Sequence, residues 1–360
     1  MSQLEELRKR IRELDADLLE LVAARMETAK AIGRQKKLDG IALRDWNVER
    51  QVLDRAARQA EQLGLPQKAV RALMQSLIAA SRDEQERLSY SDYRGAAENI
   101  LIIGGAGTMG RWFADFFGNQ GHRVSIHDPK VGTADTSLAA ALDETSCTLI
   151  ATPLDVVPEV IAQIATTGYG GVVFDIASLK SHLKPAIARA RAGGVALTSV
   201  HPMFGPGTRT LSDQVICICD CGDAEATRKV EAFFADTAAT LVKLSLDEHD
   251  RIVSYVLGLS HLTNIVFTKV LMDSGLPFER INQVGSTTFQ SQMVTTETVI
   301  RENPDLYYAI QKLNPFSAEL RESFRRELET ISGWIRDDDA QAFRAMMQSG
   351  EEWMAGDDAD

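Results

Sequence analysis

The sequence has few cysteines, no long apolar run and a deficit of positive charge. Four cysteines in 360 residues are too few for a disulfide framework and fit a reducing cytoplasm. No uninterrupted apolar run approaches the ~18 residues of a membrane span, and the first residues lack the apolar stretch of a signal peptide. The net charge of −12 argues against broad electrostatic binding to nucleic acid or to an anionic membrane. Any anion site must therefore be a local cluster of cations.

Three of the cysteines lie close together without the neighbours that a metal site needs. Cys217, Cys219 and Cys221 alternate with other residues, so a strand would place all three on one face. A metal site is conceivable, but no histidine lies nearby and a fourth ligand is missing. The pattern favours small apolar side chains in a buried strand.

The sequence pattern divides the chain into three parts, and the first of them, at the N-terminus, is predicted to be helical. At ~100–200 residues per domain, the length suggests two or three domains. Within residues 1–90, apolar spacings of three and four predict one long helix to about Leu38 and a second over 45–62. A third is expected to begin after Pro66 and run to about Leu88. The stripe on the long helix suggests packing against a partner, and it comprises Leu4, Leu7, Ile11, Leu14, Leu18 and Leu21.

The pattern changes after a linker at 91–98. Over residues 99–245, short apolar runs alternate with helix-length segments, which predicts a Rossmann-like, doubly wound parallel sheet with helices on both faces. The expected strands are 99–103, 124–126, 148–151, 172–176 and 195–199. Residues 246–354 have no strand signal and predict a second all-helical domain, followed by a frayed tail at 355–360. The predicted fold is a multidomain α and α/β protein.

A glycine-rich turn follows the first expected strand. Gly105, Gly107 and Gly110 form G-x-G-x-x-G before a helix, which permits a tight turn, the approach of a pyrophosphate and close helix packing. Asp128 ends the next strand, where it can bond a ribose 2′-hydroxyl and repel a 2′-phosphate, so NAD is favoured over NADP. A turn without a ligand is the alternative. The expected cofactor contacts are Gly105, Gly107, Thr108, Met109, Gly110, Asp128, Thr152 and Pro153.

Two further segments place polar side chains at the same sheet edge. Ser178 follows one expected strand within Asp-Ile-Ala-Ser-Leu-Lys, and His201 follows the next within His-Pro-Met-Phe-Gly. A neutral histidine can take a proton from a hydroxyl as hydride leaves the same carbon, while Ser178 can orient the imidazole or the substrate. A histidine before Pro-Met is often structural, but the position of His201 beside a dinucleotide site favours catalysis.

These motifs, together with Glu248-His-Asp and His261 further on, resemble prephenate dehydrogenase. The helical N-terminus resembles the all-helical chorismate mutases, so nearly the whole chain resembles the bifunctional chorismate mutase/prephenate dehydrogenases of tyrosine biosynthesis. The resemblance implies a homodimer that converts chorismate to prephenate and then, with NAD, prephenate to 4-hydroxyphenylpyruvate. It implies that His201 is the general base and that the C-terminal helices build the dimer and close the prephenate site. His249 and His261 match histidines near that site, with helix packing as their alternative role.

The resemblance also implies a mutase pocket. A dianion that rearranges without an external nucleophile needs cations for its carboxylates and donors to its ether oxygen. The matching residues are Arg8, Arg25, Lys36, Asp45, Glu49, Ser81 and Gln85, with Gln85 donating to the ether oxygen beside Lys36. Arg25 and Lys36 lie near one helical face, but Arg8 is ~25 Å from Arg25 along the helix. The resemblance assigns Arg8 to the partner's pocket, and a solvated basic face is the alternative for all three cations.

Two positions depart from the family's pattern. Val48 and Gln290 stand where the mutases and the dehydrogenases, respectively, usually have an arginine in the site. The substrates are therefore chorismate and prephenate or, as the alternative, their 4-amino-4-deoxy analogues. A dehydrogenase with a non-catalytic helical dimerisation or sensing module is another interpretation. A 3-hydroxy acid dehydrogenase is disfavoured because the lysine such enzymes need is missing from the helical pattern.

Overall fold

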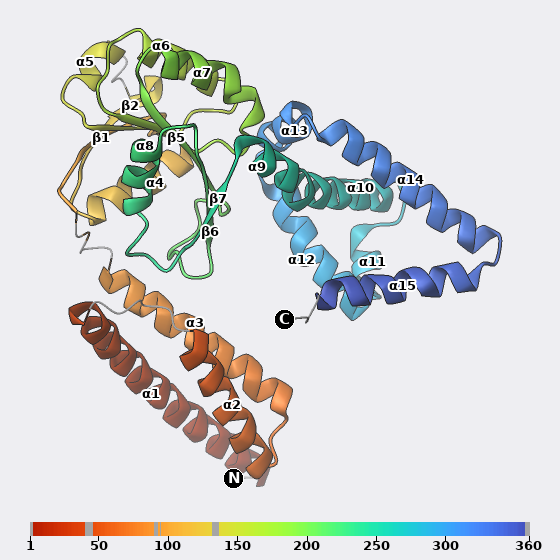
Figure 1. The fold of residues 1–360 in the computed structure, drawn as a ribbon. Helices are drawn as coiled ribbons and strands as arrows, with labels where there is room; N and C mark the ends of the chain where they lie inside the picture. Colours follow the sequence, from red (N-terminus) through yellow and green to blue (C-terminus); the bar gives the residue numbers. More distant parts are fainter. Residues whose placement is uncertain (1–2, 40–45, 90–92, 94, 132–136, 357–360) are drawn as a thin grey trace. The chain divides into compact units, whose positions relative to one another are not determined.

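The computed structural model describes residues 3–39, 46–89, 93, 95–131 and 137–356. The chain forms two compact units, Met1–Leu246 and Asp247–Asp360, which are described separately. The first holds a helical segment followed by a sheet with its helices, and the second is helical in its described residues (Figure 1). The multidomain α and α/β fold predicted from the sequence is confirmed.

The N-terminal helices have nearly the bounds that their apolar spacing predicts: α1 (Gln3–Leu38), α2 (Trp46–Gln62) and α3 (Gln67–Ser89). Both α1 and α2 pack on α3. Gly33 allows close contact, because a Cβ there would lie 2.9 Å from Gln85 Cγ. Every residue from 3 to 21 is exposed, and the six apolar residues of the α1 stripe have exposed fractions between 46% and 69%. The described residues of one chain therefore leave half of α1 uncovered.

The sheet has seven strands among the described residues, in the order β2-β1-β3-β4-β5-β6-β7. Their bounds are β1 (Asn99–Ile103), β2 (Arg123–His127), β3 (Cys147–Ile150), β4 (Val172–Asp175), β5 (Ala196–Pro202), β6 (Val215–Cys219) and β7 (Thr240–Leu244). The five predicted strands are β1 to β5, but β5 extends three residues past its predicted end at 199 and includes His201, which was expected to follow it. Neighbours are parallel except β5 and β6, whose antiparallel pairing corrects the expectation of a wholly parallel sheet. The segment between them contains no helix that could return the chain to the opposite edge.

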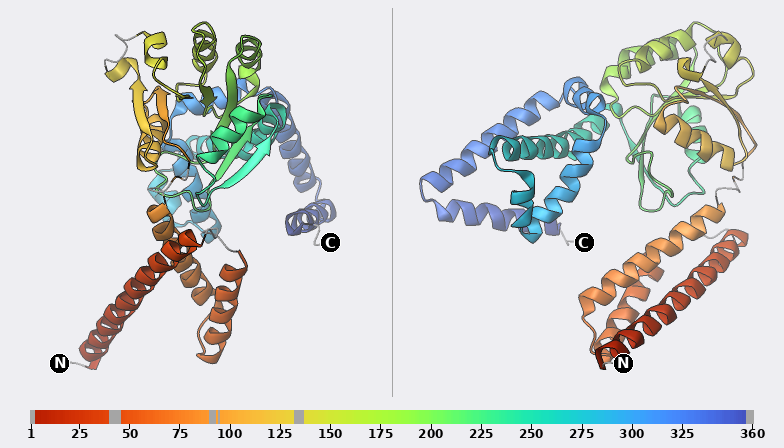
Figure 2. Two further views of the ribbon diagram at one scale, coloured as in Figure 1. Left: turned by 60° about the vertical axis from the view of Figure 1, so that its left-hand side comes forward. Right: turned by 180° about the vertical axis from the view of Figure 1, so that it is seen from behind.

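Helices cover both faces of this sheet, as Figures 1 and 2 show. Phenylalanines of α4 and the residues around α8 join the strands in the main buried cluster, whereas α6 and α7 pack together. The helical elements of this part are α4 (Thr108–Asn119), η1 (Pro129–Val131), α5 (Leu138–Leu142), α6 (Val157–Ala165), η3 (Ser181–Leu183), α7 (Lys184–Ala192) and α8 (Ala224–Ala232).

The cysteine pattern belongs to β6 and the residues after it. Cys217 and Cys219 share one face of the strand, and Ile216 and Ile218, which alternate with them, are buried on the other. All four cysteines of the chain are buried, and none forms a disulfide. The strand is therefore enclosed on both faces, and the thiols fill the core as small apolar groups.

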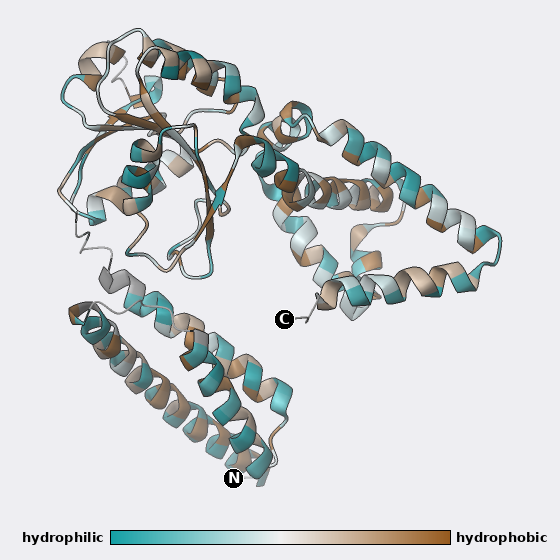
Figure 3. Cartoon of the chain, viewed as in Figure 1, coloured by the Kyte–Doolittle hydropathy of each residue, from teal (hydrophilic) through white to brown (hydrophobic). Residues whose placement is uncertain are grey.

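The second unit continues from the end of the sheet as helices. They are α9 (Leu246–Val253), the π-helical turn η4 (Ser254–Leu259), α10 (Ser260–Asp273), α11 (Phe278–Gln283), α12 (Thr287–Arg301), α13 (Pro304–Leu313), α14 (Ser317–Arg336) and α15 (Ala340–Ala355). By length and composition alone, the helical stretch Leu246–Asp273 is apolar and long enough to cross a membrane. Of the 18-residue window that meets this criterion, 17% is buried in the structure. Figure 3 shows the apolar character of α10.

Candidate functional sites

The glycine turn between β1 and α4 has room for a ligand at one glycine in particular. A Cβ on Gly110 would lie 2.5 Å from Gly104 O, so packing of α4 on the turn requires that glycine. A Cβ on Gly107 would meet its nearest protein atom at 3.3 Å, which a small shift could relieve. Gly107 is also the N-cap of α4, and no side chain caps this end. The turn thus presents backbone N–H groups and a Cβ-free surface, as a pyrophosphate site requires.

Asp128 lies immediately after β2 and holds the glycine turn. Its Oδ2 accepts a hydrogen bond from Ala106 N at 3.0 Å, and its Oδ1 accepts one from Lys130 N at 2.8 Å. A carboxylate oxygen can accept more than one hydrogen bond, so Asp128 has the chemistry to bind a ribose hydroxyl. Thr152 follows β3 at the same edge, and its buried Oγ1 has no partner among the described residues. The group therefore fits a dinucleotide, with Thr108 and Met109 opening α4 and Pro153 following Thr152.

An enclosed ion pair fixes the turn that carries Ser178. Lys180 is fully buried, and its Nζ donates to Asp175 Oδ1 at 2.9 Å and to Val200 O at 2.8 Å. The same Oδ1 accepts from Ala177 N at 2.9 Å. Since Val200 belongs to β5, the lysine ties the turn after β4 to the neighbouring strand. Sequence reasoning missed this pair, although both members belong to the motif around Ser178.

The strand register places Ser178 and His201 at one edge. Asp175 of β4 is paired with Ser199 of β5 in a parallel ladder. Ser178 lies three positions beyond this pair, in the turn after β4, and His201 lies two positions beyond it, on β5. Ser178 is half-buried, and the side chain of His201 is 4% exposed. The carboxyl ends of β1 and β3 reach the same edge with the glycine turn and Thr152. The structure thus brings the predicted cofactor residues and the predicted proton acceptor to one side of the sheet.

Both histidines of the second unit are packed among its helices. His249 is fully buried with its Nδ1 2.8 Å from Asp250 Oδ1, and Asn314 Nδ2 donates to the backbone carbonyl of Asp250 at 2.8 Å. His261 stacks on Tyr307 with ring centroids 4.0 Å apart, and burial lowers its pKa. These contacts support the helix-packing alternative. The buried Nδ1 of His261 has no partner among the described residues, so its substrate role stays a prediction.

Gln290 lies on α12 and is exposed. Its Nε2 donates to Asn282 Oδ1 at 3.0 Å, which holds the amide against the end of α11. The side chain offers hydrogen bonds without a charge, so its predicted contact with a substrate carboxylate would be weaker than that of an arginine.

In the helical segment, α1 and α3 bring four of the predicted mutase residues toward each other. Arg25 donates to Leu77 O at 2.7 Å and to Ser81 Oγ, and partial burial lowers the pKa of its guanidinium. Gln85 packs against Gly33, one helical turn before Lys36. Both Gln85 and Lys36 are half-buried.

The remaining mutase residues have different surroundings. Glu49 of α2 accepts from Arg82 Nη1 at 3.0 Å through Oε1 and at 3.2 Å through Oε2. Arg8 is exposed in the uncovered half of α1, and Asp45 lies outside the described residues. Sequence reasoning missed Arg82, although its position on α3 between Ser81 and Gln85 could have indicated it.

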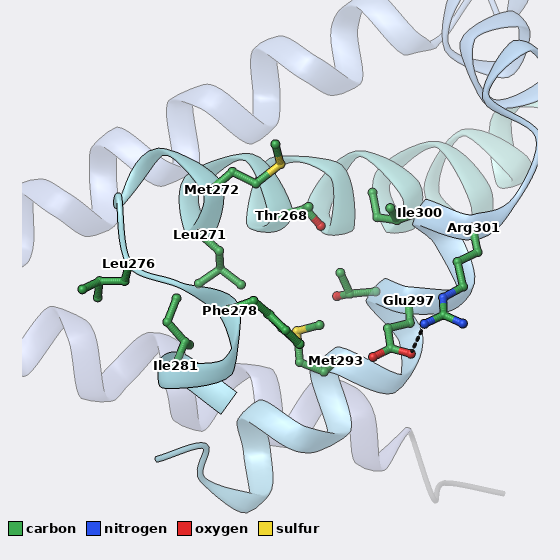
Figure 4. Close-up of a pocket in the computed structure, with 11 residues that line it drawn as sticks. Thr268, Leu271, Met272, Leu276, Phe278, Ile281, Met293, Glu297, Ile300 and Arg301 are labelled. Atoms are coloured by element: carbon green, nitrogen blue, oxygen red, sulfur yellow. Dashed lines mark ion pairs between the residues drawn. The ribbon is translucent and has the colours of Figure 1, made fainter. Parts of the chain in front are cut away.

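An apolar pocket of about 260 Å³ lies between α10, α11 and α12, as Figure 4 shows. The charged groups in its lining are Glu297 and Arg301, which pair with each other at 3.4 Å. The rest is mainly apolar, including Leu271, Phe278 and Met293. This lining suits an apolar group better than acid–base chemistry.

Three protein-family models match successive parts of the chain. The model of chorismate mutase type II matches residues 7–86. The model of the prephenate dehydrogenase nucleotide-binding domain matches residues 119–243. The model of the prephenate dehydrogenase dimerization domain matches residues 245–349.

Individual relatives extend this comparison. The chain is 24% identical over 359 residues to a T-protein of Enterobacter agglomerans, covering 100% of this chain and 95% of the relative. It is 22% identical over 261 residues to a 4-amino-4-deoxyprephenate dehydrogenase of Streptomyces pristinaespiralis, covering 68% of this chain and 88% of the relative. The A. aeolicus prephenate dehydrogenase solved with hydroxyphenyl propionate and NAD+ superposes with a TM-score of 0.58 at 17% identity, covering 73% of this chain and 100% of that one. The last likeness establishes the fold.

Proposed function

Because the chain belongs to the bifunctional chorismate mutase/prephenate dehydrogenase family, we propose that it acts on the hydroxylated substrates of this pathway through the residues described above. It is an enzyme of tyrosine biosynthesis with two activities. The helical N-terminal domain converts chorismate to prephenate, and the rest of the chain oxidises and decarboxylates prephenate with NAD to 4-hydroxyphenylpyruvate. The observation that carries the residue assignment is the sheet edge shared by the glycine turn, Asp128 and His201.

At the dehydrogenase site, His201 takes the proton of the ring hydroxyl. NAD, when bound, supplies the acceptor for the hydride that leaves the same carbon. As the carbonyl forms there, the bond to the ring carboxylate breaks and carbon dioxide leaves. The electron pair of that bond moves through the ring to the carbonyl oxygen, which takes up a proton, so the product is an aromatic phenol. Ser178 orients the imidazole or the substrate, and the pair of Lys180 with Asp175 holds its turn against β5. The protein's contribution is proton removal and positioning.

At the mutase site, the chain folds the substrate and stabilises charge. Lys36 and Arg25 on α1 attract the carboxylates, while Gln85 on α3 donates to the ether oxygen as its bond to carbon breaks. No nucleophile or cofactor is needed, since the bonds rearrange within one molecule. Placing these donors in advance removes the entropic cost of ordering them during the reaction.

We further propose that the enzyme is a homodimer. The uncovered half of α1 carries its apolar stripe, and α10 exposes Val270 and Met272 by 63% and 71%. Exposed apolar surface on this scale marks a protein interface, and the apolar pocket in Figure 4 belongs to the same helical unit. The membrane-length apolar stretch that includes α10 is then a subunit-facing helix. The absence of a disulfide among the four cysteines agrees with a cytoplasmic location, where thiols stay reduced.

Steady-state kinetics with four substrates tests the proposed substrate class. We expect higher kcat/KM with chorismate and prephenate than with their 4-amino-4-deoxy analogues. The amino series is the second candidate, because Val48 and Gln290 replace arginines of the family pattern and one relative is named as a 4-amino-4-deoxyprephenate dehydrogenase. Higher kcat/KM with both amino substrates would reverse the assignment. Turnover of prephenate without any turnover of chorismate would instead identify the helical domain as non-catalytic.

Mixed dimers test whether each mutase pocket uses both subunits. Arg8→Ala and Lys36→Ala homodimers should each lose most mutase activity, because every pocket lacks one cation. A heterodimer of the two variants should regain about one good pocket of two, since the defects then fall together in the other pocket. Tandem affinity tags purify the heterodimer, and chorismate consumption is measured. Failure of verified heterodimers to exceed both parents would contradict a shared pocket.

A further inference from the structure

We propose that Arg82 binds a carboxylate of the mutase substrate and so supplies from α3 the cation that α2 lacks at Val48. This inference rests on the proposed mutase function of the helical domain. Val48 is 50% exposed beside Glu49, and it cannot bind an anion. Arg82 reaches the same Glu49 from the opposite helix. The positive charge expected next to that glutamate is therefore present, but it comes from a different helix.

The hydrogen bonds of Arg82 leave one of its donors without an acceptor. Its side chain is only 13% exposed, and its Nη1 donates to both oxygens of Glu49 at 3.0 and 3.2 Å. The Nε atom is buried and has no partner among the described residues. A buried guanidinium N–H without an acceptor is costly, whereas a carboxylate can satisfy such a donor with favourable geometry. A dianionic substrate brings carboxylates of this kind.

The position of Arg82 along α3 places it beside the other predicted donors. Residues on a helix are ~100° apart, so Gln85 lies ~40° around the axis from Ser81 and ~60° from Arg82. Ser81 contacts Arg25 of α1, and Arg82 contacts Glu49 of α2. Gln85 therefore lies angularly between a contact to α1 and a contact to α2. The three side chains form one continuous polar face, on which Arg82 adds a cation to those of Arg25 and Lys36.

A purely structural role makes a different prediction. The Nη2 of Arg82 also contacts Asp213, on the segment before β6. If Arg82 only linked these two carboxylates, its loss would change stability and leave the affinity for chorismate unaltered. In that case Val48→Arg would not compensate for the loss of Arg82, because an arginine on α2 would not remake the ion pairs that Arg82 forms from α3. Moving the arginine from position 82 to position 48 therefore distinguishes substrate binding by Arg82 from a role in linking the two carboxylates.

The test compares Arg82→Val with the double variant Val48→Arg/Arg82→Val in the full-length enzyme. Loss of one charge-assisted contact should raise the KM for chorismate about 10- to 100-fold in Arg82→Val. The double variant should recover at least tenfold of that loss. Arg71→Val removes an exposed arginine from the same helix and should leave the KM near the parent value. NAD-dependent oxidation of added prephenate reports in each variant whether the chain is folded.

Each outcome decides the proposal. An unchanged KM for chorismate in Arg82→Val would overturn it, while chorismate turnover by the parent would leave the proposed mutase function intact. A raised KM that the double variant does not lower would also overturn it, because Arg82 would then act only through its ion pairs. Asp213→Asn should keep the parent KM, and an increase equal to that of Arg82→Val would assign the effect to the linkage. A parent without chorismate turnover would overturn both the proposed function and this inference.

Discussion

The His201→Asn variant is expected to reduce NAD with prephenate ~10²–10⁴-fold more slowly than the parent, while converting chorismate at the parent rate. Asparagine keeps a polar side chain of similar reach, but it cannot accept the proton of the ring hydroxyl at neutral pH. Without that base, the hydride must leave a carbon whose oxygen is still protonated. The loss should appear in kcat, since the glycine turn and Asp128 bind the cofactor independently of the imidazole.

Three measurements on one preparation make this result specific. Stopped-flow or steady-state absorbance follows NADH formation, fluorescence titration follows NAD binding, and chorismate consumption reports on the helical domain. NAD affinity and mutase turnover should remain at parent values. A dehydrogenase rate equal to that of the parent would remove His201 from the mechanism, and a loss of NAD binding would show that the substitution damages the sheet edge.

The Lys180→Met variant is expected to lose ~3–5 kcal/mol of unfolding free energy together with most dehydrogenase activity. The substitution leaves Asp175 buried without its cation, and a lone buried carboxylate is far more costly than a buried pair. Val200 O also loses its donor. Because the lysine ties the turn after β4 to β5, Ser178 should no longer be held beside His201.

A double variant and an exposed pair provide the controls. Asp175→Asn/Lys180→Met removes both charges and should regain much of the lost stability. Lys269 pairs with Asp273 on α10 with side chains 66% and 62% exposed, so Lys269→Met should cost less than ~1 kcal/mol. Urea unfolding followed by circular dichroism measures all three. Equal destabilisation by Lys180→Met and Lys269→Met would contradict the importance of the buried pair.

Local patterns were sufficient to predict most elements of this chain. The helices α1, α2 and α3 follow from apolar spacing and from breakers such as Pro66, which act between near neighbours in sequence. The strands β1, β3, β4 and β5 follow from short apolar runs, because both faces of a central strand are buried. The glycine turn could be recognised because three glycines at fixed spacing meet a local geometric need.

Contacts between distant segments were decided only by the tertiary structure. The antiparallel insertion of β6 beside β5 depends on how a long connection returns to the sheet, which apolar spacing does not encode. Likewise, Lys180 reads as an ordinary surface charge in sequence, and only the approach of β5 makes it a buried link to Val200. The ion pair of Arg82 could not be predicted either, because its partner Glu49 lies 33 residues away on another helix. Local periodicity sets which elements form, whereas the pairing of charges across elements depends on distances that arise only when those elements pack.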